Sequence, residues 1–347
     1  MTVTPHNKPS LGEEELNAAQ EVITSGMLAG GKQTALFEDE ICQFLGLPKG
    51  HAVATSTGSS ALFLSLTMLK SKKVVIPTYV CHSLKQAAKL AKVETEFVDI
   101  AEDSTVICQK SLSSCDADTL IHPYIYGEAS ELPKFSGHII EDVAQALGAS
   151  VNNQKLGTIA DIGVLSFYAT KLITSGGQGG MVVSKNKQHI KDIRNYLNFD
   201  MPTDQLDHFN LPMTEIQAAI GRSQLKKLPN FLKKREEIWQ IYHQAGLPLM
   251  NINSDTNELN KNLVINSVKY RAILMTPKAK QLINYLAEHN IVAIVPIEEG
   301  ELLTPTKNAL KLTMNTVSLP IYPSLSHQQA EKIARLCQKF FSRKDGE

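Results

Sequence analysis

The feature that most constrains the fold is a regular alternation of short apolar runs with helical patterns from His51 onward. The first two runs, at residues 52–55 and 74–77, are each followed by a segment of helical periodicity, at 60–69 and 84–91. Further strands are expected at 96–98, 120–124, 138–141, 162–167 and 181–184, and further helices at 187–197, 214–227 and 230–243. This alternation is typical of the α/β class, in which helices cover a sheet.

Two helices are expected before this region, and a mixed pattern follows it. A capping-box sequence from Ser10 to Glu13 opens a helix that ends at Gly26, and a second helix ends at Gly46. After residue 243, strands are expected at 263–266, 271–275, 291–295 and 316–319, and helices at 279–288 and 326–341. We therefore expect a large domain of residues 1–240 and a smaller C-terminal α+β domain of residues 241–347.

Composition favours small-molecule chemistry. The 347 residues include 35 basic and 35 acidic side chains that are interspersed, so neither a nucleic acid nor a membrane partner is expected. The N-terminal sequence lacks the apolar core of a signal peptide, and no apolar run reaches membrane-spanning length, which favours a cytoplasmic location. The 5 cysteines include no Cys-x-x-Cys pair, which argues against a disulfide framework and against a metal site.

Lys171 is the strongest candidate for a chemical role. It ends the stretch Ser166-Phe-Tyr-Ala-Thr-Lys171 and precedes a glycine-rich run from Thr174 to Gly180. Glycines let the backbone pass close to a bulky ligand, and an enclosed lysine amine attacks an aldehyde well. Because the lysine precedes the glycines, the run is not a Walker phosphate loop. We interpret Lys171 as a Schiff-base lysine for pyridoxal phosphate; a solvated surface lysine is the alternative.

Upstream motifs suit the same cofactor. The turn Thr57-Gly58-Ser59-Ser60 joins an expected strand to an expected helix, where free N–H groups and the helix dipole favour a phosphate, although an ordinary helix cap is the alternative. Asp142 follows an apolar run, so its carboxylate is expected at the carboxyl end of a strand, with Gln145 three residues on. An acid there can pair with a pyridinium nitrogen while the amide meets the ring hydroxyl, and a buried structural aspartate is the alternative. Ser166, at a later strand end, could reach the same phosphate.

Together these motifs resemble the DegT/StrS family of pyridoxal-phosphate enzymes, which are mostly aminotransferases acting on nucleotide-linked keto sugars. The resemblance covers nearly the whole chain. It rests on residues 25–26, 37–38, 57–62, 77–79, 141–148, 166–171, 213–221, 224–228 and 319–323. It implies fold type I of these enzymes, a three-layer α/β arrangement of a mostly parallel seven-stranded sheet with helices on both faces, plus a smaller C-terminal domain.

The resemblance also implies roles for the matching residues. Lys171 would form the internal aldimine, Asp142 would protonate the ring nitrogen, and Gln145 would hydrogen-bond the ring hydroxyl. Asn210 matches an asparagine that reaches the phosphate of the neighbouring subunit, which implies a homodimer with shared active sites. The full cofactor-binding set expected is Thr57, Gly58, Ser59, Cys81, Asp142, Gln145, Ser166, Lys171 and Asn210.

Three features depart from the family pattern. Cys81 stands where the family usually has an aromatic residue that stacks on the cofactor ring, and Tyr79 and His82 are the nearby substitutes. Pro212 stands where the family often has arginine, so one charge near the shared site is missing. The segment 294–316 is shorter than the family stretch that shapes the substrate pocket.

The expected reaction is a two-stage amino transfer. Glutamate, or another amino donor, leaves its nitrogen on the cofactor, and a keto sugar that is expected to be nucleotide-linked then takes it. The freed Lys171 amine carries the proton between substrate and cofactor. Sugar dehydratases of the family have histidine at this position, so Lys171 favours transamination.

Other interpretations follow from the same residues. A different pyridoxal-phosphate reaction on a substrate without a nucleotide is one, and a non-catalytic regulatory protein that binds the cofactor is another. A Rossmann oxidoreductase is excluded, because no Gly-x-Gly-x-x-Gly follows the first strand. The possible partners for a substrate carboxylate or diphosphate are Arg194, Arg222, Arg235 and Arg271, although surface or structural roles are expected for all of them.

Overall fold

The computed structural model describes residues 3–200, 207–250 and 263–342, and its centre is a seven-stranded sheet. Its strands are β1 (Ala52–Thr55), β2 (Lys73–Pro77), β3 (Glu94–Val98), β4 (Thr119–Pro123), β5 (His138–Asp142), β8 (Ile162–Ser166) and β9 (Gly180–Val183). In space they follow the order β1, β9, β8, β5, β4, β2, β3. Strand β9 runs antiparallel to both of its neighbours, whereas the other adjacent pairs are parallel. The expected α/β class with a mostly parallel sheet is confirmed.

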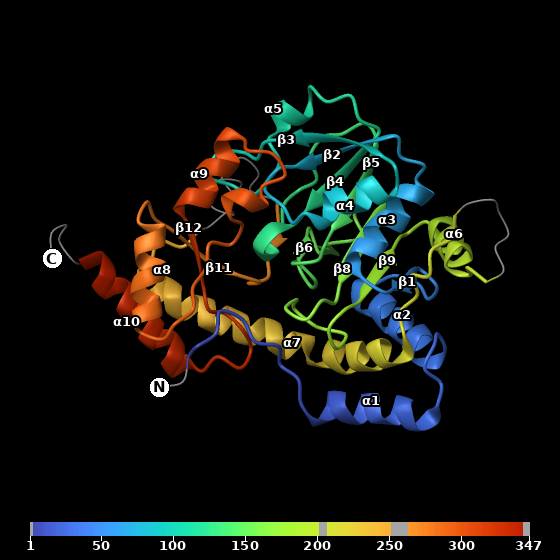
Figure 1. Cartoon of the computed structure of the whole chain (residues 1–347), viewed down its shortest axis with the longest axis horizontal. Helices are drawn as coiled ribbons and strands as arrows, with labels where there is room; N and C mark the ends of the chain where they lie inside the picture. The colour runs from blue at the N-terminus through green and yellow to red at the C-terminus, as the bar shows by residue number, and fades with distance from the viewer. Residues whose placement is uncertain (1–2, 201–206, 251–262, 343–347) are drawn as a thin grey trace.

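Helices cover both faces of this sheet (Figure 1). On one face lie α3 (Gly58–Met68), α4 (Ser83–Leu90) and α6 (Lys187–Leu197), and on the other lie α2 (Lys32–Leu45) and α7 (Glu215–Gln244), with α1 (Glu13–Ser25) packed along α7. Side chains alternate across each strand, so Val53 packs with the first layer while its neighbours Ala52 and Ala54 pack with the second. None of the helices in the described ranges is both long and apolar enough to cross a membrane.

The C-terminal elements surround a hydrophobic core of their own. They are β11 (Ala272–Met275), α8 (Ala279–Glu288), β12 (Thr316–Leu319) and α10 (His327–Ser342). The strands form an antiparallel pair, and the core also includes Ile238, Trp239 and Tyr242 from the end of α7. In Figure 1, α7 runs from beneath the large sheet to these elements. The proposed domain boundary after residue 240 lies inside α7 and stays a prediction.

Three expectations about secondary structure were wrong. The capping residues of α1 are Gly12 and Glu15, with the Gly12 N–H donating to Glu15 Oε2 at 2.8 Å, and not Ser10 and Glu13. Residues 215–244 form one helix through Pro229, where we expected a break. A proline removes one helical hydrogen bond, but here the flanking turns are held by packing, with Leu225, Leu228 and Phe231 in one core. The expected strand at 291–295 is absent, because Ile291 pairs with Thr4 and Ile294 with Ser318, and such single bridges build no ladder.

The sequence patterns also missed several short elements. These are α5 (Gln109–Leu112), β6 (Ser150–Val151), β7 (Gln154–Lys155), α9 (Lys307–Asn315) and the single turns Ile125–Gly127 and Glu299–Glu301; β6 and β7 form a small sheet with β10 (Ile265–Asn266). The start of α9 is held by Asp99, whose carboxylate accepts hydrogen bonds from the Thr306 hydroxyl at 2.6 Å and the Asn308 N–H at 2.9 Å. Because Asp99 is distant in the sequence, no local capping pattern announces this helix.

A buried acid fixes the strand end that matters most for function. Glu141, in β5, is fully buried and accepts hydrogen bonds from three backbone N–H groups of residues 157–160, at 2.8 to 2.9 Å. It also accepts one from the Tyr124 hydroxyl at 2.9 Å. These contacts tie the loop after β7 to the carboxyl end of β5, where Asp142 follows.

Replacing Glu141 with alanine is expected to lower the free energy of unfolding by about 3–5 kcal/mol, because it leaves several buried donors without an acceptor. Urea unfolding followed by circular dichroism measures this change. The exposed Glu288 provides a control, since Glu288→Ala is expected to change stability by no more than about 0.5 kcal/mol. A Glu141→Ala protein as stable as this control would show that the network contributes little.

Candidate active site

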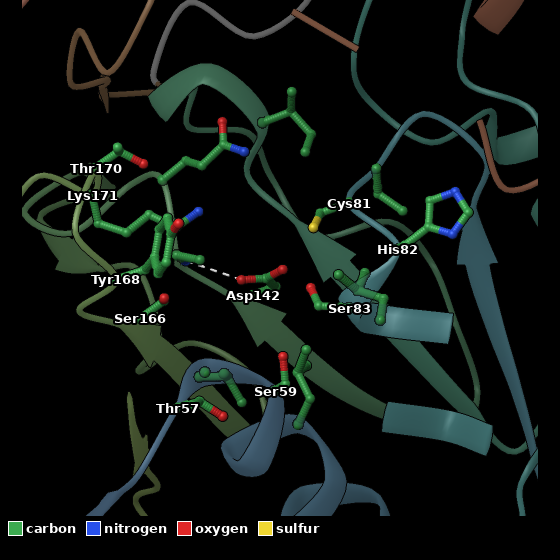
Figure 2. A pocket seen from close by; sticks show the side chains of 18 of the residues that line it. Thr57, Ser59, Cys81, His82, Ser83, Asp142, Ser166, Tyr168, Thr170 and Lys171 are labelled. Atoms are coloured by element: carbon green, nitrogen blue, oxygen red, sulfur yellow. Dashed lines mark hydrogen bonds between the residues drawn. The ribbon is translucent and has the colours of Figure 1, made fainter. Parts of the chain in front are cut away.

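One cavity of about 710 Å³ gathers the expected residues at the carboxyl ends of β5 and β8 and the N-terminus of α3 (Figure 2). The expected residues in its wall are Thr57, Gly58, Ser59, Cys81, Asp142, Gln145, Ser166 and Lys171. In Figure 2, Asp142 lies between Lys171 on one side and Cys81 on the other, with Thr57 and Ser59 below. Asn210 does not line this cavity and is exposed.

The N-terminus of α3 offers an anion site. The Thr57 hydroxyl caps the helix by accepting the Ser60 N–H at 2.9 Å, so the capping interpretation is correct. The N–H groups of Gly58 and Ser59, in the first turn, have no hydrogen-bond partner in the described ranges and are available to an anion. A Cβ at Gly58 would lie 2.9 Å from the Ser166 Cβ, so only glycine allows this turn to lie against β8. The Ser166 hydroxyl therefore lies beside the same N–H groups.

A second glycine allows a close approach of backbone to backbone. A Cβ on Gly180 would lie 2.2 Å from the Thr57 carbonyl oxygen. We expected the glycines after Lys171 to make room for a ligand, but this one makes room for the turn at the N-terminus of α3. Strand β9 therefore supports the turn directly.

Asp142 is a buried carboxylate at the end of β5, with 9% of its surface exposed. Its Oδ1 accepts the Ala144 N–H at 3.0 Å, the bond drawn in Figure 2. Burial raises the pKa of this carboxyl above its ordinary value, while the Ala144 N–H and the charge on Lys171 oppose the rise. Within the part of the chain that the structure describes, only one hydrogen bond and the charge on Lys171 stabilise the charged form of this buried carboxylate. It is therefore well suited to a cationic ligand group in the cavity.

Lys171 extends into the cavity from a loop that is held at several points. Its backbone N–H donates to the Tyr168 carbonyl at 3.0 Å, and the preceding carbonyl, of Thr170, accepts from Asn7 Nδ2 at 3.0 Å. The Lys171 Nζ lies 5.6 Å from the centre of the Tyr270 ring. The amine is thus half-buried but faces open cavity.

Gln145 is oriented by a bond to the backbone. Its Oε1 accepts the N–H of Tyr126 at 2.8 Å, and Tyr126 has a left-handed backbone with φ 63°. The amide nitrogen of Gln145 has no hydrogen-bond partner within the described ranges. It is therefore the donor that this side chain offers to the cavity.

Residues 9–338 match the model of the DegT/DnrJ/EryC1/StrS aminotransferase family. The chain belongs to this family. The aminotransferase is 27% identical over 374 residues to a GDP-perosamine synthase from Vibrio cholerae, covering 97% of this chain and 99% of the relative. It is 29% identical over 259 residues to a UDP-4-amino-4,6-dideoxy-N-acetyl-beta-L-altrosamine transaminase from Campylobacter jejuni, covering 68% of each.

A solved structure supports the fold of the aminotransferase. The PLP-form of a putative sugar aminotransferase from Streptococcus pneumoniae superimposes with a TM-score of 0.83 at 19% identity, covering 97% of this chain and 99% of that one. The cofactor of the family is pyridoxal phosphate. The cavity fits it, because free N–H groups suit its phosphate, a buried carboxylate suits its ring nitrogen, and the Lys171 amine faces the same cavity.

Three residues were candidates for the position that stacks on the cofactor ring, and the structure places two of them in the cavity wall. Cys81 and His82 line the cavity and are exposed. Tyr79, the other substitute considered, is fully buried, and its hydroxyl lies 2.6 Å from that of Tyr126. Tyr79 therefore does not face the cavity.

Sequence patterns missed part of the wall. The additional residues include Ser83, Tyr168, Thr170, Gln178, Tyr270, Pro296, Ile297 and Glu301. The last three come from the short segment 294–316, which therefore does shape the cavity.

The arginines also differ from expectation at one position. Arg194 and Arg222 form ion pairs with Glu38 and Glu40, and Arg235 is buried, as expected for structural residues. Arg271 instead lines the cavity, which is where a partner for a substrate carboxylate or diphosphate has to lie.

Proposed function

We propose that this aminotransferase moves an amino group from glutamate to the keto group of a nucleotide-linked sugar. The observation that carries the proposal is that Lys171, Asp142 and Gln145 face one cavity beside the free N-terminus of α3. The names of the relatives support the acceptor, since one contains a GDP-linked and the other a UDP-linked sugar.

Each side chain has a proposed task. The Lys171 amine attaches the cofactor and later moves a proton to or from the substrate carbon. Asp142 would keep a positive charge on the ring nitrogen, and Gln145 would donate to the ring hydroxyl. The N–H groups of Gly58 and Ser59, with the Ser166 hydroxyl, hold the phosphate. When bound, pyridoxal phosphate supplies an electron sink for the carbon that loses its proton.

The net reaction exchanges an amine for a carbonyl. The Cα of glutamate loses its hydrogen and its bond to nitrogen and takes an oxygen from water to become the carbonyl of 2-oxoglutarate. The oxygen of the sugar carbonyl leaves as water. The sugar carbonyl carbon gains a C–N bond and a hydrogen, so no external oxidant or reductant is needed.

The test is to incubate the cofactor-loaded protein with glutamate and a GDP- or UDP-linked 4-keto-6-deoxy sugar, and to analyse the products by liquid chromatography and mass spectrometry. We expect an amino sugar nucleotide and 2-oxoglutarate in equal amounts. If 2-oxoglutarate forms only with a keto sugar that carries no nucleotide, the proposed acceptor is wrong. If no keto sugar, with or without a nucleotide, raises 2-oxoglutarate above one equivalent per protein, the proposed function is wrong.

We further propose that the protein works as a homodimer in which Asn210 reaches the phosphate site of the partner subunit. Asn210 is exposed and outside the cavity of its own chain. Several large apolar side chains are also exposed along α1 and the loop after it, among them Leu16 with 66% and Met27 with 64% of their surface exposed. Exposed apolar side chains of this size are common where a second copy binds.

Mixing two inactive variants tests the shared site. In a two-fold dimer, a hybrid of Lys171→Ala and Asn210→Asp subunits holds one site in which both residues are native. Refolding an equal mixture is therefore expected to recover about a quarter of the wild-type activity, although each variant alone is strongly impaired. Sedimentation of the wild-type protein is expected to give the mass of a dimer. If the protein is a dimer but the refolded mixture is no more active than either variant alone, Asn210 does not act in the partner's site.

A further inference from the structure

Arg271 reaches the catalytic cavity from the C-terminal part of the chain. It immediately precedes β11 and is half-buried in the cavity wall. Its guanidinium carbon lies 5.4 Å from the centre of the Tyr270 ring, and Lys171 Nζ lies 5.6 Å from the same centre. The guanidinium and the catalytic amine therefore share one aromatic neighbour.

The partners of Arg271 are neutral, and they occupy only one of its nitrogens. Its Nη1 lies 3.2 Å from His6 Nε2 and 3.4 Å from the Ser318 hydroxyl. Burial and the charges of Arg271 and Arg235 lower the pKa of His6 to about 3, so this imidazole is neutral and can accept. In the described part of the chain, the arginines that form ion pairs are Arg194, Arg222 and Arg335, and Arg271 is not among them. Its remaining N–H groups are available to the cavity.

A second arginine increases the positive charge at this place. Arg235 is 2% exposed, and its guanidinium lies 5.9 Å from the centre of the Tyr270 ring. Its Nη1 donates to the carbonyls of Tyr270 and Ile321, and its buried Nε has no partner among the described residues. Buried cations without an acid are costly. Burial raises the pKa of the Tyr270 hydroxyl, but Lys171, Arg271 and Arg235 together lower it below its ordinary value, as expected beside concentrated positive charge.

The cavity thus has two places suited to anions, and the cofactor phosphate accounts for only the one at α3. Of the acids in the cavity wall, Asp142 is assigned to the ring nitrogen, and Glu301 is exposed and accepts the Glu298 N–H at 2.8 Å. A planar guanidinium with several free donors matches a carboxylate in a two-point contact. In an α-amino acid the nitrogen and the carboxylate are attached to the same carbon, so a donor that reacts beside Lys171 brings its carboxylate to this neighbourhood.

From this arrangement we infer that Arg271 binds a carboxylate of the amino donor, held in place by His6 and Ser318. The inference rests on the proposed function, because it names the residue that recognises the donor in the first half of the reaction. A diphosphate of the acceptor is the other anion that an arginine could bind here, and the experiment separates the two.

The test compares wild type with Arg271→Gln and Arg271→Lys, each loaded with pyridoxal phosphate. Isothermal calorimetry measures the binding of 2-methylglutamate, a donor analogue that has no hydrogen on its α carbon, and separately of UDP and GDP. Loss of a charged two-point contact is expected to weaken 2-methylglutamate binding by ~10- to 100-fold in Arg271→Gln. Arg271→Lys, which keeps the charge but not the planar fork, is expected to lose part of the affinity while it retains the fold. UDP and GDP binding is expected to change by less than about 3-fold, a difference below 1 kcal/mol.

Arg335→Gln is the matched control, since Arg335 lies on α10 in an exposed ion pair with Glu331. It is expected to bind 2-methylglutamate like wild type. Weakened binding of UDP or GDP instead of the amino acid analogue would assign Arg271 to the acceptor and overturn the inference. Unchanged binding of every ligand in Arg271→Gln would also overturn it. These binding measurements do not depend on turnover. If the proposed acceptor is wrong, the wild-type protein gives no amino sugar nucleotide in the product assay, which is a separate result.

Discussion

Replacing Lys171 with alanine is expected to reduce the rate of 2-oxoglutarate formation from glutamate by at least about 10³-fold. The variant loses both the amine that attaches the cofactor and the group that moves a proton at the substrate carbon, and proton transfer by a positioned side chain alone contributes about 10²- to 10⁴-fold. The chain loses no buried contact of consequence, since Lys171 is half-buried and faces the cavity. A continuous enzyme-coupled assay of 2-oxoglutarate measures the loss.

Lys185→Ala is the control for this experiment, because Lys185 is an exposed lysine just after β9 that does not line the cavity. Its rate is expected to match wild type. A Lys171→Ala protein that keeps more than about a tenth of the wild-type rate would contradict the assignment, because general acid–base catalysis alone is worth more than that.

Replacing Asp142 with asparagine is expected to lower kcat by about 10²- to 10³-fold, the usual effect of removing one preorganised electrostatic group. An amide cannot stabilise a positive charge on the ring nitrogen, although it has nearly the same shape as the carboxylate. The Ala144 N–H can still donate to the remaining oxygen, as it does at 3.0 Å in the native site.

The same substitution should have little effect on the stability of the cofactor-free protein. Burial raises the pKa of Asp142, which means that the charged carboxylate is poorly solvated when no cation lies beside it. A neutral amide avoids that cost, so the free energy of unfolding is expected to stay within about 1 kcal/mol of wild type. Two results would point to a structural aspartate. One is a loss of unfolding free energy large enough to account for the loss of activity, and the other is a kcat within about 3-fold of wild type.

Much of the site could be predicted from the sequence because its motifs are local. Thr57 to Ser60 lie at a strand-to-helix turn, Asp142 ends a strand, and both positions follow from the alternation of apolar runs. Parallel strands place their carboxyl ends at one edge of the sheet, so residues far apart in sequence were expected to meet there. The cavity contains them together with Lys171.

The other features depend on contacts between distant segments. Arg271 is oriented by His6 and Ser318, and α9 is capped by Asp99, none of which is close in the chain to its partner. Helix α7 continues through Pro229 because surrounding side chains hold both halves, an effect that local propensity does not contain. Residue periodicity reports which face is buried, but not which neighbour buries it.

The most direct test of the central claim is borohydride reduction of the cofactor-loaded protein, followed by peptide mass spectrometry, with and without prior incubation with excess glutamate. Without glutamate, we predict that the cofactor is trapped on Lys171. After glutamate, we predict that this labelling is largely lost, because the donor has displaced the lysine and left its amino group behind. Labelling of a different lysine, or labelling of Lys171 that glutamate does not change, would contradict a Lys171-dependent transfer of the donor's amino group.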